Sequence, residues 1–346
     1  MLSLFSRIQS IIISTLFLAA LVANIFVFQS SFFGAILLAI YLLLFGAHLG
    51  KALAPKDSGA LSSWLGIFIL LSVILLFGSA AYYVANLTAP VAYTIALLSV
   101  PISLWFHKKA KTHWFDQKHN FLKEKLHAIP NSVYLSATII LFCSFFILST
   151  LFASGTTEAI RSVWEDIPVA VFVAAFIALL CLFTLLYRGK EKRLTLILTS
   201  IILFTILSVA LFVFPIGYGF DSFIHEATET YIAEHGTITP KPFYYIGQYS
   251  LVLFFHHVFL IPIELADKLL VPVLTALLLP IAFFSAASHL LSRKRAASAA
   301  LMLIFFIPLS SFIVTTPQGL ANLWTILIIL AAIPFMLNLE RPRIEP

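Results

Sequence analysis

The chain has 346 residues; 61% of them are hydrophobic, only 10% are charged, and the formal net charge is +6. A water-soluble domain carries about a quarter charged residues, so this composition excludes a string of soluble domains. It also excludes a disulfide framework, because the two cysteines, Cys143 and Cys181, both lie inside apolar runs. The composition instead predicts a polytopic membrane protein.

Charge-free apolar runs recur along the chain. The hydrocarbon core of a bilayer, about 30 Å thick, needs roughly 20 apolar residues in a helix. Continuous runs favour helices, because a membrane barrel would alternate apolar and polar residues. The runs that approach or meet this length are 8–28, 31–49, 63–85, 88–106, 132–153, 167–187, 194–214, 269–291, 297–316 and 318–338. They predict an all-α fold with about ten transmembrane helices.

Basic residues indicate how these helices are oriented. The run 249–263 would reach only about 22 Å as a helix, and we predict that it lies at the surface. With a cytoplasmic N-terminus, every lysine and arginine then faces the cytoplasm except Arg161, Lys241 and Lys268. This is the bias expected of a membrane protein, and it is lost if the run crosses. Both termini are therefore predicted to be cytoplasmic, and we expect a prokaryotic plasma membrane.

The segment 107–127 mixes lysines with aromatic residues. Such a stretch would suit either nucleic acid or anionic lipid. Its place between two predicted spans favours a cytoplasmic loop that contacts the acidic headgroups of membrane lipids. No nucleic-acid partner is expected.

The longest segment predicted outside the membrane is 216–268, and it holds most of the outward acidic residues. Within it, residues 221–235 are predicted to form a short helix that ends at Gly236. One face of this helix carries Asp221, His225, Thr228 and Glu229, and another carries Phe223, Ile224, Ala227 and Tyr231. The pattern predicts a helix in the interface, with its apolar side toward lipid and its carboxylates toward water.

A second surface-lying helix is predicted after the turn 239–242, opened by the aromatic residues Phe243, Tyr244, Tyr245 and Tyr249. Asp221 would then lie just outside the bilayer, with Lys241 further along the same segment. Such a site suits a substrate that has a lipid tail and a polar head. A carboxylate can act as a general base and a cation can hold a phosphate. The alternative interpretation is an acidic, amphipathic connector without chemistry.

Short motifs follow one another in a fixed order from the end of the seventh predicted span. They are Phe214-Pro215, Tyr218-Gly219-Phe220-Asp221, His225, Glu234-His235-Gly236, Lys241-Pro242-Phe243-Tyr244-Tyr245 and Ser292-Arg293-Lys294-Arg295. In this order they resemble the first outer loop of the GT-C superfamily of integral-membrane glycosyltransferases. That superfamily includes protein O-mannosyltransferases, lipid A aminoarabinose transferases and catalytic subunits of oligosaccharyltransferase. The resemblance covers roughly residues 194–338.

The resemblance implies transfer of a hexosyl or pentosyl group, with inversion, from a polyprenyl-phosphate sugar to an acceptor lipid, glycan or protein on the non-cytoplasmic side. It gives Asp221 the role of catalytic base and Lys241 that of a phosphate contact. The further candidate substrate-binding residues are His225, Glu226, Glu229, Tyr244 and Tyr245. Some members use a divalent metal ion, which Asp221 with Glu226 or Glu229 would hold, although no ligand spacing in the chain requires one.

The chain departs from the superfamily pattern in three ways. Lys241-Pro242-Phe243 stands where the superfamily has Lys-Pro-Pro. Six predicted spans, in residues 1–193, precede the motifs as a bundle of unknown role, and only three spans follow them. Residues 194–346 are thus expected to form a partial module that is short at its C-terminal end. Either the chain is a fragment, or activity requires a partner, or activity is absent.

Two other classes of function compete with a transferase. A transporter or flippase of lipid-linked saccharides would place ionisable residues and broken helices near the membrane midplane, whereas no charged residue falls inside a predicted span. A non-catalytic membrane subunit would agree with the short C-terminal end.

Overall fold

The computed structural model describes residues 2–54, 59–109, 130–158, 160, 162, 164–188, 192–241, 244–291 and 294–340. These residues form helices joined by turns, and they include no β-strand, which confirms the all-α prediction. Eight of the described helices are long and apolar enough to cross a membrane. The chain is therefore an all-α polytopic membrane protein. The basic segment expected at 107–127 lies almost entirely outside the described residues.

The chain divides into two compact units, each made of two stretches of sequence. Unit 1 comprises Met1–His127 and Ile224–Asp267, and unit 2 comprises Ala128–Phe223 and Lys268–Pro346. This division does not coincide with the boundary expected after residue 193, because most of the segment 216–268 packs with the first four helices. Two of the three points of division lie inside continuous helices, α10 (Phe220–His235) and α12 (Ile263–Leu290).

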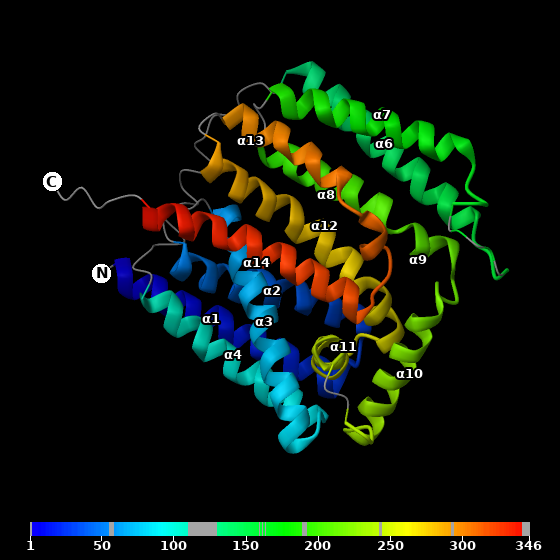
Figure 1. The fold of residues 1–346 in the computed structure, drawn as a ribbon. Helices are drawn as coiled ribbons and strands as arrows, with labels where there is room; N and C mark the ends of the chain where they lie inside the picture. Colours follow the sequence, from blue (N-terminus) through cyan, green and yellow to red (C-terminus); the bar gives the residue numbers. More distant parts are fainter. Residues whose placement is uncertain are drawn as a thin grey trace. The chain divides into compact units, whose positions relative to one another are not determined.

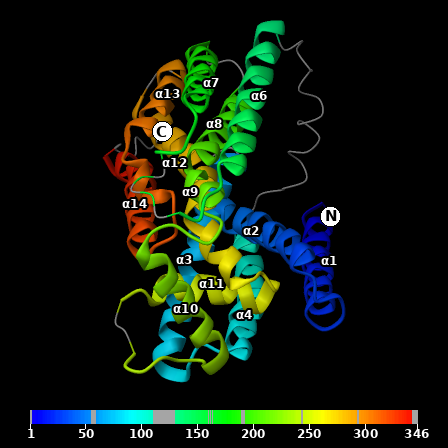
Figure 2. The same ribbon diagram turned by 90° about the vertical axis from the view of Figure 1, so that its right-hand side faces the viewer.

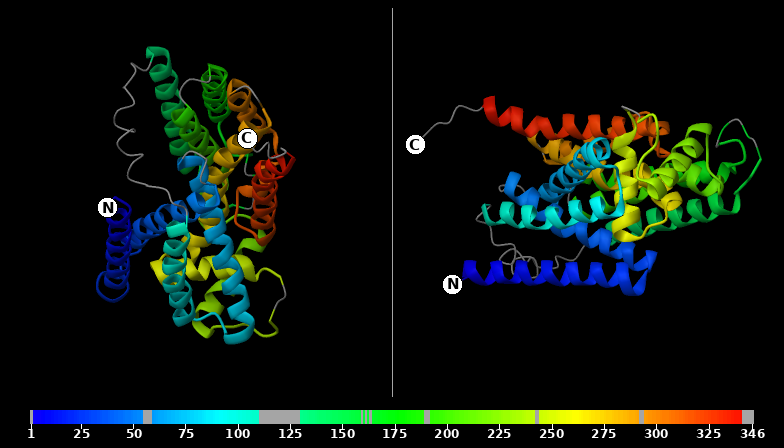
Figure 3. Two further views of the ribbon diagram at one scale, coloured as in Figure 1. Left: turned by 90° about the vertical axis from the view of Figure 1, so that its left-hand side faces the viewer. Right: turned by 90° about the horizontal axis from the view of Figure 1, so that it is seen from below.

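Unit 1 is built on four long helices that are consecutive in the sequence. They are α1 (Leu2–Ala23, extended by the π-turn η1 Asn24–Phe28), α2 (Ser31–Leu53), α3 (Gly59–Ala85) and α4 (Ala89–Lys109). The helix α2 begins where the Ser30 hydroxyl accepts a hydrogen bond from the Phe33 amide (3.2 Å). The helix α1 lies at the edge of the unit, where it contacts α2 and α4 (Figure 3).

Glycines let α2 and α3 pack at short range. A β-carbon at Gly50 would overlap the carbonyl oxygen of Ser62, and one at Gly66 would overlap that of Gly46. Small residues at such crossings allow two membrane helices to bring their backbones together, where van der Waals packing stabilises the pair.

The helix α11 (Ile246–Phe259) runs across this bundle. Figure 1 looks along its axis while α2, α3 and α4 are seen from the side, and Figure 2 shows it lying across them. Two glycines make room for it, because a β-carbon at Gly34 would overlap the carbonyl oxygen of Phe259 and one at Gly78 would lie 2.8 Å from the β-carbon of Ser250.

The prediction for this segment was right about length and wrong about exposure. With 14 residues, α11 is not among the long apolar helices that could cross the membrane, as expected. Its side chains, however, are nearly all buried, and they contact α2, α3 and α4. The short length and the distribution of basic residues, which indicated a surface-lying helix, contain no information about this packing inside unit 1.

Apart from α10, which is divided between the units, unit 2 contains the other helices of the part of the chain that the structure describes. They are α6 (Asn131–Ala153), α7 (Val169–Arg188), α8 (Lys192–Leu207), α9 (Val209–Val213), most of α12, α13 (Lys294–Ala300), the 3-10 turns η2 (Leu301–Phe306) and η3 (Leu309–Phe312), and α14 (Pro317–Glu340). The helices α6 and α7 pack side by side, and α8 contacts both (Figures 1 and 2).

Two of the ten predicted spans are interrupted in this unit. The run 194–214 is split at Ser208 into α8 and α9, and the Ser208 hydroxyl donates to the carbonyl oxygen of Thr205 (3.0 Å). The run 297–316 changes from α13 to two 3-10 turns around Pro308, which has no amide hydrogen to donate. The length and hydropathy of both runs predicted apolar segments, but these properties do not show where a helix is interrupted.

The helix α12 begins earlier than the predicted span 269–291. It starts at Ile263, so Glu264, Asp267 and Lys268 belong to its first turns rather than to a connecting loop. The helix therefore begins six residues before the predicted span. Its 28 residues reach about 42 Å, more than a hydrocarbon core needs.

Candidate functional site

The candidate site is built on α10, whose predicted limits are confirmed. The helix runs from Phe220 to His235, and Gly236 follows it with a φ of +75°, a conformation that favours glycine. The Gly236 amide donates to the carbonyl oxygen of Ile232 (2.7 Å), and the Gly236 carbonyl accepts from the amide of Leu87 (2.8 Å). The end of α10 is thus tied to the α3–α4 turn.

The orientation of α10 differs from the prediction. Its apolar side chains Phe223, Ile224 and Tyr231 are 45–48% exposed, which agrees with a face turned toward lipid. The opposite face, which was expected to carry carboxylates into water, instead buries His225 and Glu229. Periodicity identified which residues share a face, but not that the polar face packs inward.

Glu229 takes part in a buried cluster of three polar side chains, which we call the carboxyl cluster. The amide nitrogen of Gln248, on α11, donates to Glu229 Oε1 (3.1 Å) and to Asp267 Oδ1 (2.8 Å), on α12. Glu229 has no exposed surface, and Gln248 and Asp267 are 1% and 2% exposed. One amide therefore joins two carboxyl groups inside unit 1.

Burial changes the protonation equilibrium of the carboxyl cluster. Desolvation raises the pKa of Glu229 well above its ordinary value, and the nearby carboxylate of Asp267 raises it further. Two acceptor atoms, Glu229 Oε2 and Gln248 Oε1, are buried without a hydrogen-bond partner. Two carboxylates sharing one donor repel each other, so the arrangement favours a protonated Glu229.

A second polar contact lies one turn away on α10. The Nδ1 atom of buried His225 and the hydroxyl of Tyr249, on α11, are 2.8 Å apart and share a hydrogen bond. The ring of Tyr245 meets the His225 ring edge-on, with 5.1 Å between the ring centroids. Around these contacts, an apolar cluster that includes Tyr82, Leu87 and Ile232 joins α10 and α11 to the end of α3.

Lys241 lies at the C-terminal end of α3. Its ammonium donates to the carbonyl oxygens of Tyr82 (2.8 Å) and Tyr83 (3.4 Å) and to Asn86 Oδ1 (3.2 Å). It also lies 5.1 Å from the centroid of the Tyr82 ring. A cation is favourable at a helix C-terminus, and these bonds use the three hydrogens of the ammonium group. The contact of Lys241 with a phosphate remains a prediction, and it requires some of these bonds to be exchanged.

The other predicted site residues differ in exposure. Asp221 is exposed in the first turn of α10, and Glu226 is partly exposed on the same helix. Tyr244 and Tyr245 are 65% and 45% exposed just before α11. The structure thus leaves Asp221 and Tyr244 accessible and encloses His225 and Glu229.

The carboxylates proposed for a divalent metal ion do not converge. Asp221 and Glu229 are separated by about 12 Å along the axis of α10, and Asp221 and Glu226 point in directions about 140° apart around it. Among the described residues, no group of three or more His, Cys, Asp or Glu side chains is arranged to hold a metal ion.

Sequence reasoning missed Gln248 and the part played by Asp267 and Tyr249. Gln248 is the only amide side chain within the apolar helix α11, and an isolated amide in such a run is a usable signal of a buried hydrogen bond. Asp267 was assigned to a loop because the start of α12 was placed too late. Its position in the first turns of a long apolar helix would have marked it as unusual.

Comparisons with known proteins give no relative from which a function can be transferred. No protein-family model, no curated protein and no solved structure matches the chain.

Proposed function

We propose that the chain is a membrane glycosyltransferase that moves a sugar from a polyprenyl-phosphate donor to an acceptor on the non-cytoplasmic side, with Asp221 as the catalytic base. The observation that carries this proposal is the exposed carboxylate of Asp221 in the first turn of α10, a short helix that also exposes Phe223, Ile224 and Tyr231. A helix with such a face lies at a lipid boundary, where the headgroup of a lipid-linked sugar is within reach of a carboxylate.

The packing of α10 supports a positioning role for this helix. Its inner face is fixed by the His225–Tyr249 contact and by the carboxyl cluster, both of which anchor it to α11. A catalytic group gains from a rigid support, because a fixed carboxylate loses little entropy when it meets its substrate. In this proposal the buried polar residues of α10 therefore position the helix, while Asp221 performs the chemistry.

The reaction needs one proton acceptor on the outer side. The Asp221 carboxylate accepts the proton of an acceptor hydroxyl as its oxygen attacks the anomeric carbon, and the bond from that carbon to the lipid phosphate breaks. The electron pair leaves with the phosphate, and attack from the far side inverts the anomeric configuration. The exposed ring of Tyr244 is a candidate surface for the sugar.

The test is transfer of radiolabelled sugar from polyprenyl-phosphate hexose and polyprenyl-phosphate pentose in proteoliposomes that contain the full chain. We expect Asp221→Asn to lower the transfer rate by about 10²-fold or more at unchanged thermal stability, because a general base contributes that much. Glu234→Gln removes an exposed carboxylate at the other end of α10 and is the matched control. Transfer by Asp221→Asn at the rate of the unmodified protein would refute the proposal.

A second candidate function is transport of lipid-linked saccharides, and specific features of the structure favour it. The runs 194–214 and 297–316 are interrupted, and a buried carboxyl pair lies close to the start of α12. Broken helices and buried ionisable groups are typical of transporters. Movement of a fluorescent lipid-linked saccharide across proteoliposomes that is lost in Glu229→Gln and retained in Asp221→Asn would favour transport over transfer.

A further inference from the structure

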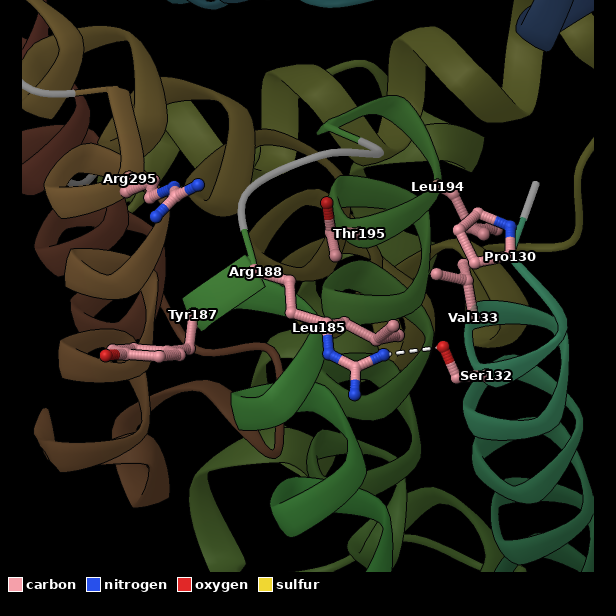
Figure 4. A pocket seen from close by; sticks show the side chains of 9 residues that line it. All are labelled: Pro130, Ser132, Val133, Leu185, Tyr187, Arg188, Leu194, Thr195 and Arg295. Carbon is pink, nitrogen blue, oxygen red and sulfur yellow. Dashed lines mark hydrogen bonds between the residues drawn. The ribbon is translucent and has the colours of Figure 1, made fainter. Parts of the chain in front are cut away.

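A cavity of about 400 Å³ lies in unit 2, where α6, α7, α8 and α13 have ends close together (Figure 4). Arg188 from the last turn of α7 and Arg295 from the first turn of α13 both line it. The guanidinium of Arg188 donates to the hydroxyl of Ser132 (2.6 Å). Among the described residues of its lining, none is acidic.

Two helix N-termini add to the positive character of this cavity. Ser132 lies in the first turn of α6, which has 23 residues, and Thr195 lies in the first turns of α8, which has 16. The backbone amides of a first turn have no partner within their own helix, and the helix dipole is positive at that end. Together with the two arginines, they form surroundings that favour an anion with several acceptor oxygens.

The rest of the lining is apolar. Val133, Leu185 and Leu194 border the same cavity, and the exposed ring of Tyr187 lies at one side of it (Figure 4). A soluble anion gains no binding energy from an apolar lining. The glycerol and first methylene groups of a phospholipid, in contrast, would bury apolar surface against it. The topology predicted from the basic residues places this end of the helices at the cytoplasmic face, where anionic lipids attract arginine and lysine.

We propose that this cavity binds a phosphate group, held by Arg188, Arg295 and the hydroxyl of Ser132. The shared chemistry is a phosphate anion, and its two possible sources are the headgroup of an anionic phospholipid and a soluble phosphate. The apolar lining assigns the site to the phospholipid. This site is separate from Asp221 and does not depend on the proposed transferase activity.

The test measures binding to the full chain in nanodiscs of defined composition. We expect phosphatidylglycerol, added to a phosphatidylcholine bilayer, to raise the melting temperature of the protein and to remain bound in native mass spectrometry. Arg188→Gln with Arg295→Gln should weaken that binding at least tenfold. Arg193→Gln, which removes an exposed positive charge on α8 outside the cavity lining, should leave it nearly unchanged.

A second arm distinguishes the two sources of phosphate. Inorganic phosphate and pyrophosphate are added to the protein in nanodiscs of phosphatidylcholine alone. They should raise the melting temperature by less than phosphatidylglycerol does. If pyrophosphate raised the melting temperature as much as phosphatidylglycerol does, the cavity would still be a phosphate site, but its assignment to a lipid would be overturned. Equal binding of phosphatidylglycerol by the unmodified protein and by the single variant Arg295→Gln, whose exposed side chain is dispensable for packing, would overturn the site itself.

Discussion

The ammonium group of Lys241 donates a hydrogen bond of 2.8 Å to the backbone carbonyl oxygen of Tyr82. The two residues belong to stretches of the chain that are far apart in sequence, the outer segment and the last turn of α3. The contact caps the C-terminal end of α3. It also attaches the turn after α10 to the helices of unit 1. A residue expected to meet a substrate thus has a structural partner in the folded protein.

Replacement of Lys241 by methionine should destabilise unit 1. The variant keeps most of the apolar stem but loses the hydrogen bonds to Tyr82, Tyr83 and Asn86 and the charge at the helix C-terminus. We expect a loss of about 1–2 kcal/mol in the free energy of unfolding, because these bonds are partly exposed. Thermal unfolding in mild detergent, followed by circular dichroism, measures the effect.

The control for this prediction is Lys268→Met. Lys268 lies near the start of α12 and donates to the carbonyl oxygen of Pro215 (3.0 Å), so its loss removes a charge but leaves the contacts at the end of α3 intact. Equal melting temperatures for Lys241→Met and the unmodified protein would show that the ammonium does not stabilise α3. A transfer rate that falls far more than stability would indicate the phosphate contact.

The pKa of Glu229 makes the stability of the fold depend on pH. Burial first, and then the Asp267 carboxylate, raise the folded-state pKa above the unfolded value of about 4.3. Above pH 4.3 the folded state therefore holds a proton that the unfolded state releases, so the free energy of unfolding falls as pH rises. The stabilisation is present at low pH and is lost as pH rises through the folded-state pKa.

Melting temperatures between pH 5 and pH 8 test this sign. We expect the unmodified protein to melt at a lower temperature at pH 8 than at pH 5, and Glu229→Gln to reduce that difference, because glutamine is neutral at both. Glu234→Gln, an exposed change on the same helix, should keep the full dependence. Glu226, Tyr249 and Asp267 also face Glu229, so some dependence will persist. A pH dependence unaltered by Glu229→Gln would contradict the prediction.

A methyl group at position 34 should disturb the crossing of α2 and α11. The β-carbon of Gly34→Ala would overlap the carbonyl oxygen of Phe259, a backbone atom that cannot rotate away. We expect a loss of about 1–3 kcal/mol, as for other over-packed sites. Gly155→Ala is the matched control, since its β-carbon would meet its nearest neighbours at 3.4 and 3.5 Å, an ordinary contact distance. Similar melting temperatures for both variants would refute this account of the crossing.

Cysteine labelling tests the predicted orientation. In a variant without Cys143 and Cys181, a membrane-impermeant maleimide should label Asp221→Cys on intact cells, because position 221 is exposed and expected outside. Arg188→Cys, exposed at the other end of the predicted topology, should react only after the membrane is permeabilised. Labelling of position 221 only after permeabilisation would exclude both the topology and the role proposed for Asp221.

The sequence was sufficient for the limits of α10 but not for the start of α12. The limits of α10 follow from its polar start and from Gly236, and the short length of the run 249–263 agrees with a helix of 14 residues, too short to be counted among the candidate spans. The end of a helix and its length are determined by residues close together in the sequence, so local sequence patterns can predict them. The breaks at Ser208 and Pro308 lie in charge-free runs, where hydropathy alone does not show a change in backbone conformation.

The carboxyl cluster was beyond sequence reasoning for a different reason. Glu229, Gln248 and Asp267 lie on three helices, and their meeting depends on the backbone between them, including left-handed conformations at Gly236 and Tyr245. Glycine at position 236 was an evident signal for such a turn, but tyrosine at position 245 was not. Helical periodicity gave the face that holds His225 and Glu229 without showing whether it points to water or to protein.

The discontinuous make-up of unit 1 has a consequence for biogenesis. The first four helices leave the ribosome well before α11, because residues 128–223 of the other unit must be synthesised in between. At about 5–20 residues per second, this delay is on the order of ten seconds. During that time the surfaces around Gly34 and Gly78 lack the contacts that α11 makes with them, and we expect lipid or the translocon to cover these surfaces until α11 is made.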